Sequence, residues 1–196
     1  MANFVVQFPL RTEKYQEDIL NKRFEIGRKI YNSLVAVSQK RYKEMIKTRK
    51  YRNLMSMLTG NKKSDKPIWK QIDQMRKEYG LTEYSLHADV KEMQKHFKKN
   101  IDSFTAQKIA TTLWKSYDKL FYGNGKRVYY KKYGDMNSLE GKSNSMGIRL
   151  RSEYLLWNGL NIPVVIDWNR FDSFKMLHNI EIQRLSSTAT LSSMGI

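Results

Sequence analysis

The spacing of apolar residues in the first part of the chain predicts one long amphipathic helix. Between Thr12 and about Tyr51, apolar side chains recur at steps of three and four residues, and no proline interrupts them. The residues with this spacing are Ile19, Leu20, Phe24, Ile30, Tyr31, Leu34, Val35, Tyr42, Met45 and Ile46. Gly27 lies inside the pattern and is the position where we expect any break in the helix.

Two further helical regions are expected before residue 125. Residues 58–67 have the composition of a loop, and a helix is predicted from about Pro67 to near Gly80. After a turn at 81–85, helical spacing resumes at Val90 and continues to Phe121. It stops at residues 122–125, Tyr-Gly-Asn-Gly, whose glycines allow the positive φ of a helix end or a tight turn.

Short apolar runs bounded by glycine, serine and asparagine predict strands at both ends of the chain. Residues 3–9 are rich in aromatic and β-branched types and end at Pro9, which suits a strand end. The later candidate strands are residues 146–150, 154–157, 162–168 and 180–185. We expect an α+β fold in which the first strand, about residues 4–9, joins the C-terminal strands in a small antiparallel sheet or barrel. The helices then form a long insertion.

This organisation divides the chain into three parts. Residues 1–10 and 125–185 would form the β-barrel, and residues 11–124 would form the helical insert. Residues 186–196 are rich in serine and threonine, uncharged and without a pattern, so we expect a disordered or truncated tail. The sequence contains no internal repeat.

The charge balance predicts a polyanionic partner. The 196 residues include 36 Lys and Arg against 19 Asp and Glu, a formal net charge of +17 that attracts polyanions from a distance. Cysteine is absent, which excludes disulfides, thiolate zinc sites and a thiol nucleophile in this chain and fits a reducing compartment. The sequence has no export signal and no run of the roughly 18 apolar residues that a membrane span needs. We therefore expect a cytoplasmic protein without a membrane partner.

Basic residues on the first predicted helix fall mostly opposite its apolar stripe. They are Lys22, Arg23, Arg28, Lys29, Lys40, Arg41, Lys43, Lys47, Arg49, Lys50 and Arg52. A solvated helix face usually mixes the two signs of charge to form pairs four residues apart, whereas acids are few here and the helix becomes more basic toward its end. A solvated face stays open as an interpretation, but the pattern favours a face that follows phosphates.

A second basic cluster alternates cations with tyrosines. Residues 125–134 read Gly-Lys-Arg-Val-Tyr-Tyr-Lys-Lys-Tyr-Gly, with four cations and three tyrosines in a predicted loop or strand edge. Cations neutralise phosphates and aromatic faces stack on unpaired bases, a combination typical of contacts with RNA or single strands. So many charges could not be buried unpaired in a core. The cluster therefore predicts nucleic-acid contact.

Two patterns in the chain resemble the TnpB or OrfB proteins of insertion sequences, transposase-associated RNA-guided endonucleases related to the compact type V CRISPR effectors. The first is the spacing of Phe24, Arg28, Tyr31 and Asn32 on a long helix after an N-terminal strand. The second comprises Leu113-Trp114-Lys115-Ser116-Tyr117-Asp118-Lys119-Leu120-Phe121, Gly125-Lys126, Tyr130-Lys131-Lys132-Tyr133-Gly134 and Ser138. The patterns together cover most of residues 4–185 and resemble the N-terminal half of the family.

The resemblance implies a wedge-type β-barrel with a helical recognition insert. In this family the half in question holds a guide RNA and the guide–target duplex, so the implied partners are a structured guide-type RNA and target DNA, and base pairing supplies most of the specificity. The implied nucleic-acid contacts are Arg28, Lys29, Lys126, Arg127, Lys131 and Lys132, with Tyr130 as a candidate stacking residue. Small relatives of the type V effectors act as dimers, so two copies on one RNA stay an open alternative.

The chain departs from the family in lacking a recognisable nuclease half. Full members carry an RNase H-like domain with three acidic residues for Mg²⁺ and a cysteine-rich zinc ribbon, and neither pattern occurs in this sequence. Asp167, after an apolar run, is the nearest candidate, but a structural aspartate at a strand end is the favoured interpretation because no acids follow it in the required pattern. We expect no catalytic residue, no metal ligand and no cofactor in this chain, and Mg²⁺ only with a nuclease domain.

The remaining residues of chemical interest have simpler interpretations. His87, His96 and His178 lack acidic or thiol companions at metal-ligand spacing, so each is interpreted as a surface or packing residue. The four tryptophans are interpreted as core aromatics: Trp69, Trp114, Trp157 and Trp168.

Three functions from different classes stay open on the sequence alone. The favoured one is an RNA/DNA-binding module of a TnpB-like protein that lacks the nuclease domain in this chain. A nuclease or transposase active by itself would need a metal site that the sequence does not contain. A generic basic architectural protein would bind duplex DNA or ribosomal RNA through charge alone, and would tolerate the substitution Tyr130→Ala.

Overall fold

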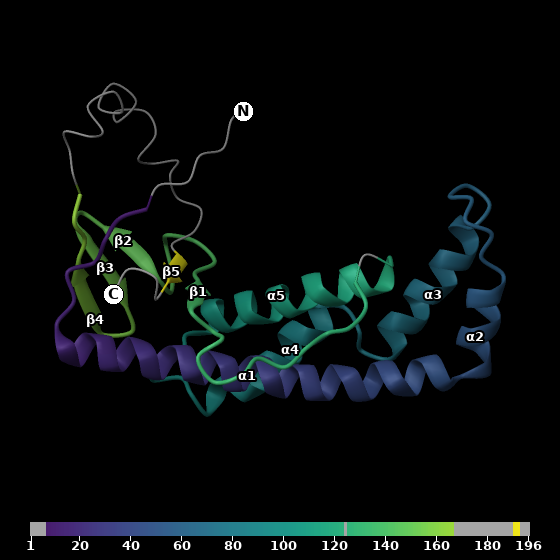
Figure 1. Cartoon of the computed structure of the whole chain (residues 1–196), viewed down its shortest axis with the longest axis horizontal. Coiled ribbons are helices and arrows are strands. Elements are labelled where there is room, and N and C mark those ends of the chain that lie inside the picture. The colour runs from purple at the N-terminus through teal and green to yellow at the C-terminus, as the bar shows by residue number, and fades with distance from the viewer. Residues whose placement is uncertain (1–6, 124, 167–189, 193–196) are drawn as a thin grey trace, which may run out of the picture.

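The computed structural model describes residues 7–123, 125–166 and 190–192. One helix, α1 (Lys14–Lys47), extends along most of the molecule. The strands lie near its first turns and a pair of shorter helices lies beyond its last turn (Figure 1). This arrangement separates a β end from a helical tip, with a helical body between them.

Helix α1 passes through Gly27 without interruption, so it is not broken at that glycine. A β-carbon at Gly27 would lie 3.0 Å from Leu139 Cδ2 and 3.3 Å from Met136 Sδ. The glycine therefore lets the segment around residues 136–139 pack directly on the helix backbone. The helix ends instead at Thr48, whose hydroxyl accepts the Tyr51 N–H at 3.2 Å and caps the following helix.

Within the described residues four more helices follow, and their bounds are α2 (Arg49–Ser56), α3 (Lys66–Glu78), α4 (Glu83–Lys95) and α5 (Ser103–Phe121). The predicted loop at 58–67 and the helix after it are confirmed. The helical spacing predicted from Val90 to Phe121 is divided between α4 and α5. The division falls at Asp102, whose carboxylate accepts the N–H groups of Phe104 at 2.9 Å and Thr105 at 3.0 Å and so starts α5.

The apolar faces of α1, α4 and α5 meet in the main core. Leu20 and Leu34 of α1, Leu86 of α4 and Leu113 of α5 are each 0–1 % exposed. Trp157 is also buried and Trp69 and Trp114 pack against this core, as the sequence predicted for the tryptophans. Trp168 lies outside the described residues.

A three-stranded antiparallel sheet forms the larger part of the β end. Its strands are β2 (Arg149–Arg151), β3 (Tyr154–Trp157) and β4 (Leu160–Pro163), paired in the order β2-β3-β4. The turn between β3 and β4 is Asn158-Gly159, with φ of +42° and +80°. Positive φ at both central residues is the requirement of a type I′ turn, which an Asn-Gly pair meets at low cost.

The N-terminal segment contacts the end of this sheet through residues 9–11, but residues 7–9 of the predicted first strand form no strand. Leu10 forms an antiparallel bridge with Val164, and the Arg11 N–H donates to the Pro163 carbonyl at 2.8 Å. A second, two-stranded sheet pairs β1 (Ser138–Glu140) with β5 (Thr190–Ser192). The pairing of β5 differs from the expectation that residues 186–196 form only a tail.

The mixed helix-and-strand class is therefore confirmed, but the described residues form two small sheets and no closed barrel. The predicted strand at 154–157 is observed, whereas the runs at 146–150 and 162–168 contribute only β2 and the end of β4. Residues 4–6 of the first predicted strand, and the whole predicted strand at 180–185, lie outside the described residues.

A buried cluster docks the sheet on the helices. Arg23 of α1 is 4 % exposed, donates to the Trp157 carbonyl at 2.8 Å and lies 4.6 Å from the centre of the Trp157 ring. The Trp157 indole N–H donates to Asp102 Oδ2 at 2.8 Å. Burial lowers the pKa of Arg23 to about 10, and the negative charge of Asp102 opposes this shift. Arg23 is thus a structural residue, which corrects its assignment to the exposed basic face.

Candidate nucleic-acid interface

An extended segment after α5, residues 126–135, lies along one side of α1 and is named the strap (Figure 1). Its direction is opposite to that of α1, and polar side chains of the helix hold both of its ends. The Gln39 side chain donates to the Val128 carbonyl at 2.9 Å, and Glu25 Oε1 accepts the Gly134 N–H at 3.1 Å. The path of the strap is therefore set through its backbone.

Asn32 holds the middle of the strap. Its Nδ2 donates to the Lys131 carbonyl at 2.9 Å, and its Oδ1 accepts the Lys131 N–H at 2.9 Å. The amide side chain thus supplies the donor and acceptor that a neighbouring strand would supply. Arg28 Nη1 donates to the same carbonyl at 3.1 Å. Val128 is buried with 3 % exposure and adds an apolar anchor.

Glu25 couples the strap to pH. Burial opposes ionisation, but hydrogen bonds from the Arg28 side chain and the Gly134 N–H together hold the pKa of Glu25 below its usual value of 4.5. A lowered pKa in the folded state means that this contact stabilises the fold above the unfolded value. The contribution is lost as the pH falls through the lowered pKa.

The side chains of the strap, in contrast, are mostly free of the helix. Tyr129, Tyr130 and Tyr133 are 65 %, 49 % and 82 % exposed. The cations Lys126, Arg127 and Lys132 are exposed as well. Large exposed aromatics interleaved with cations, on a backbone fixed in advance, form a suitable surface for stacking bases and neutralising phosphates.

Five lysines of α1 form an exposed line along the helix, named the lysine stripe: Lys22, Lys29, Lys40, Lys43 and Lys47. Their separations of 7, 11, 3 and 4 residues keep them on one side of an α-helix. At a rise of 1.5 Å per residue the stripe is about 38 Å long. Among the described residues none of the five forms a salt bridge, so their charges are available to phosphates.

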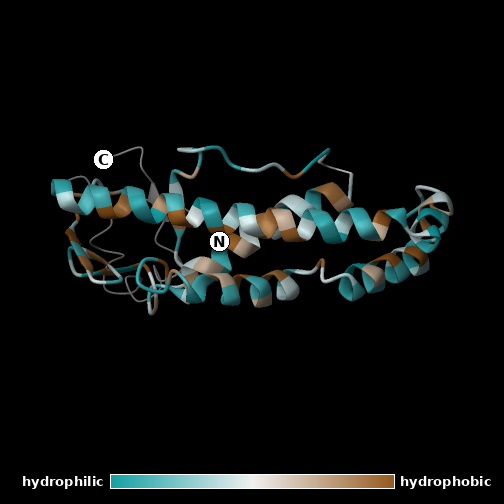
Figure 2. Ribbon diagram, turned by 90° about the horizontal axis from the view of Figure 1, so that it is seen from below, coloured by the Kyte–Doolittle hydropathy of each residue, from teal (hydrophilic) through white to brown (hydrophobic). Residues whose placement is uncertain are grey.

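The strap and the lysine stripe are neighbouring surfaces. At 3.6 residues per turn, the stripe is rotated by roughly 70° around α1 from the residues that bind the strap. On its other side the stripe borders α4, and Figure 2 shows the strap and α4 on opposite sides of α1. One continuous cationic surface therefore extends from the strap across α1 to the end of α4.

The structure brings most of the sequence-predicted contact residues onto this surface. Lys29, Lys126, Arg127, Tyr130 and Lys132 are all exposed on the stripe or the strap. The other two predicted contacts differ in position.

Arg28 and Lys131 are partly withdrawn from solvent. The Arg28 side chain is 18 % exposed and pairs with Glu25 at 2.8 Å, so part of its hydrogen-bonding capacity serves the strap. Lys131 Nζ lies 5.5 Å from the centre of the Tyr31 ring. Arg41, also placed on the basic face by the sequence pattern, forms an ion pair with Asp89 of α4 and is a structural residue too.

Sequence reasoning selected Tyr130 alone of the three strap tyrosines and gave no role to Gln39 or Glu25. The signal for the anchors is present in the sequence as polar residues at 25, 28, 32 and 39, which share one side of a helix. Their meaning depends on a segment about a hundred residues away, which periodicity within one helix cannot reveal.

The helical tip formed by α2 and α3 carries additional positive charge. Residues 48–80 include nine Lys and Arg against three Asp and Glu. Asp65 is taken up by the loop, where it accepts the N–H groups of Thr59 at 3.0 Å and Gly60 at 2.8 Å. Arg76 is also internal, 4 % exposed and 4.1 Å from the centre of the Phe121 ring. The other basic residues of the tip are exposed.

Other candidate chemistry is limited in the part of the chain that the structure describes. His87 contacts the Thr111 hydroxyl at 2.9 Å, and that hydroxyl donates to Glu83 at 2.7 Å, which makes a polar contact between α4 and α5. Over residues 7–123, 125–166 and 190–192 no group of three or more His, Asp or Glu could hold a metal ion. No helix in these ranges is long and apolar enough to cross a membrane. Asp167 and His178 lie outside them.

No protein-family model matches the chain, and no curated protein or solved structure matches it significantly.

Proposed function

We propose that this chain is the RNA/DNA-binding, wedge-plus-recognition module of a TnpB-like RNA-guided endonuclease, and that it binds a structured, guide-type RNA. The observation that supports RNA binding most directly is the strap, with three exposed tyrosines and three exposed cations on a fixed backbone. The TnpB-like assignment is supported by the sequence resemblance, which spans the helix α1 and the strap. Target DNA would enter as the strand paired with the guide.

The lysine stripe and the strap would contribute differently to RNA binding. The lysine stripe neutralises phosphates over about 38 Å, which gives affinity without selecting a sequence. The strap tyrosines add stacking on unpaired bases, which favours RNA with loops or bulges over a uniform duplex. Because α1 fixes the strap backbone beforehand, binding does not carry the cost of ordering it.

The experiment that tests this proposal is binding of the purified chain to RNA copied from its own genetic locus and to a scrambled RNA of equal length, across a salt series. Charge alone would give steep salt dependence for both RNAs, so the ratio of the two affinities is the decisive quantity. We expect a preference of at least about tenfold for the locus RNA, near 1.4 kcal/mol. Sizing the complex in the same samples gives the number of protein copies on one RNA.

Substitutions in the strap and in the lysine stripe test whether these surfaces bind the RNA. Replacing Tyr129, Tyr130 and Tyr133 together by alanine should weaken binding of the locus RNA by about 1–3 kcal/mol for each stacked base. The matched control is Tyr84→Ala, since Tyr84 of α4 is 84 % exposed and lies outside the strap. Replacing Lys40 and Lys43 by glutamine should reduce the salt slope by about 0.7–0.9 for each phosphate that is no longer neutralised.

The outcomes separate the candidate functions. Equal affinity for the two RNAs, with Tyr130→Ala tolerated, would favour a generic basic architectural protein. Absence of RNA binding at low salt would reject both interpretations of the surface.

A further inference from the structure

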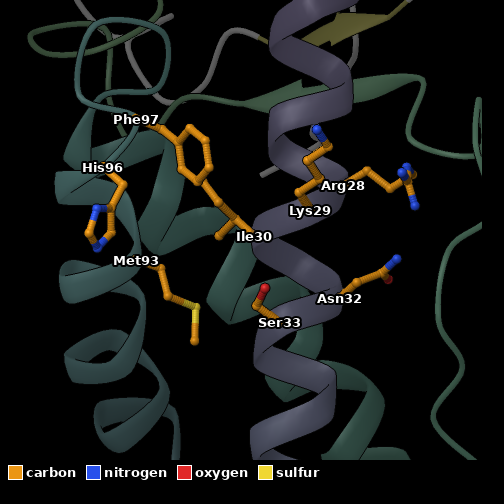
Figure 3. Close-up of a pocket in the computed structure, with 8 residues that line it drawn as sticks. All are labelled: Arg28, Lys29, Ile30, Asn32, Ser33, Met93, His96 and Phe97. Carbon is orange, nitrogen blue, oxygen red and sulfur yellow. The ribbon is translucent and has the colours of Figure 1, made fainter.

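A groove borders the lysine stripe on the side that faces α4. It lies between α1 and the end of α4 and has a volume of about 530 Å³. Met93, His96 and Phe97 line it from α4 and the turn after it, and five residues line it from α1: Arg28, Lys29, Ile30, Asn32 and Ser33 (Figure 3). Arg28 and Asn32 of this set also hold the strap. The groove is open to solvent, and its volume falls in the range of small-molecule sites, roughly 300–1,000 Å³.

The groove has an apolar base and a polar rim. Ile30 is buried, and Met93 and Phe97 are partly buried and pack against the core while still facing the groove. Lys29 and Ser33 are exposed on the α1 side. His96 is exposed on the α4 side of the groove (Figure 3). The apolar base suits a flat, uncharged group, and the polar rim suits a group whose edges form hydrogen bonds. Lys29 on the rim suits an anion attached to that group.

We infer that this groove holds one unpaired nucleobase of an RNA whose backbone follows the lysine stripe, an inference that rests on the proposed function. Lys29 belongs both to the stripe and to the rim, so a phosphate neutralised there places its base at the mouth of the groove. The Phe97 ring and the Met93 thioether offer the apolar contact that an unstacked base needs. Ser33 and His96 can exchange hydrogen bonds with its edges.

Charge complementarity favours this occupant over an apolar peptide side chain. An apolar peptide side chain would fill the base of the groove but would leave the exposed rim groups Lys29, Ser33 and His96 in water. A nucleotide can instead pair its phosphate with Lys29 and the edges of its base with Ser33 and His96. Lys98 and Lys99 are exposed just after α4, whereas Lys95 pairs with Glu92 at 2.8 Å. The groove therefore has an apolar base and cations near its rim. This arrangement complements a nucleotide, whose base has apolar faces and whose phosphate is anionic.

The experiment uses the full chain and two RNA hairpins with identical stems, one fully paired and one with a single bulged 2-aminopurine. We expect the chain to bind the bulged hairpin about tenfold more tightly, and the fluorescence of the bulged base to change on binding. The substitution Phe97→Leu, which keeps the apolar volume and removes the aromatic face, should reduce the ratio of the two affinities to about threefold or less. Ser33→Trp, at an exposed helix position that tolerates substitution, should close the groove and have the same effect.

The matched control is Phe104→Leu, since Phe104 is a partly buried phenylalanine outside the groove, and this variant should keep the full ratio. Equal binding of the two hairpins by the unaltered chain would overturn the groove assignment and leave the proposed function standing. A tenfold ratio that survives both Phe97→Leu and Ser33→Trp would also overturn it, because the base would then bind elsewhere. If the chain bound neither hairpin, the proposed RNA-binding function would itself be rejected.

Discussion

At the scale of single residues, Asp102 connects the two halves of the molecule. Its Oδ1 caps α5, while its Oδ2 accepts the Trp157 indole N–H at 2.8 Å and the Thr105 hydroxyl at 2.6 Å. Gly147 packs against the same carboxylate, since a β-carbon there would lie 2.7 Å from Asp102 Oδ1. One carboxylate thus joins a helix start, a strand and a turn.

We expect Asp102→Ala to lower the free energy of unfolding by about 2–4 kcal/mol. The substitution removes a helix cap, which costs about 0.5–2 kcal/mol, and leaves the buried Trp157 N–H without an acceptor, which costs about 1–3 kcal/mol. Asp102→Asn keeps one acceptor oxygen and should lose about half as much. Urea unfolding followed by circular dichroism measures these differences.

The control for this series is Asp118→Ala, an exposed aspartate on the same helix, which should change stability by less than about 0.5 kcal/mol. If Asp102→Ala were as mild as Asp118→Ala, the sheet would be held on the helices mainly by other contacts, such as those of Arg23.

At the scale of elements, the strap is a segment without regular secondary structure that α1 nevertheless keeps in one path. Its anchors are single hydrogen bonds from helix side chains, and each contributes only about 0.5–1.5 kcal/mol. The strap should therefore open locally more often than the helices beneath it.

We expect Asn32→Ala to speed hydrogen exchange of the Lys131 amide by at least tenfold, because that amide donates to Asn32 Oδ1. Amides in the middle of α5 should keep their protection. Exchange measured by NMR distinguishes the two, with Asn53→Ala on the exposed side of α2 as the matched substitution. An unchanged Lys131 exchange rate would mean that Arg28 and Gln39 suffice to hold the strap.

The elements also show where sequence reasoning works. The apolar spacing within α1 and the loop composition at 58–67 report local preferences, so both predictions agree with the structure. The Asn158-Gly159 pair was a further local signal for the β3–β4 hairpin. Gly27 was misread because its role is contact with residues 136–139, and the groove at Lys29 and Phe97 arises only when α1 and α4 meet. Such features depend on tertiary packing, which periodicity along the chain does not contain.

At the scale of the whole molecule, buried tyrosines make the stability of the helical body depend on pH at the alkaline end. Burial raises the pKa of Tyr117 to about 12, partly offset by the nearby Ser38 hydroxyl. Burial likewise raises the pKa of Tyr31, Tyr42 and Tyr51. Tyr117 lies at the centre of an aromatic group, with ring centres 6.3 Å from Tyr42 and 5.7 Å from Phe121.

We therefore expect the free energy of unfolding to fall as the pH rises from about 10 toward 12. The unfolded chain releases the Tyr117 proton near pH 10, whereas the folded chain keeps it to about pH 12, so stability is full below the unfolded pKa and lost above it. Each unit of pH in this window removes up to about 1.4 kcal/mol for this group. Tyr117→Phe should show a shallower decline in urea midpoint between pH 9 and 11.5, and an identical decline would mean that other groups cause it.

The way in which the strap is attached has a consequence for variation. Since α1 binds the carbonyls and N–H groups of Val128, Lys131 and Gly134 rather than their neighbours' side chains, positions 129, 130, 132 and 133 can change identity while the path of the chain is retained. A library randomised at these four positions should keep most of its members folded while altering what they bind. The strap is thus the segment in which new RNA preferences can be selected with the smallest loss of folding stability.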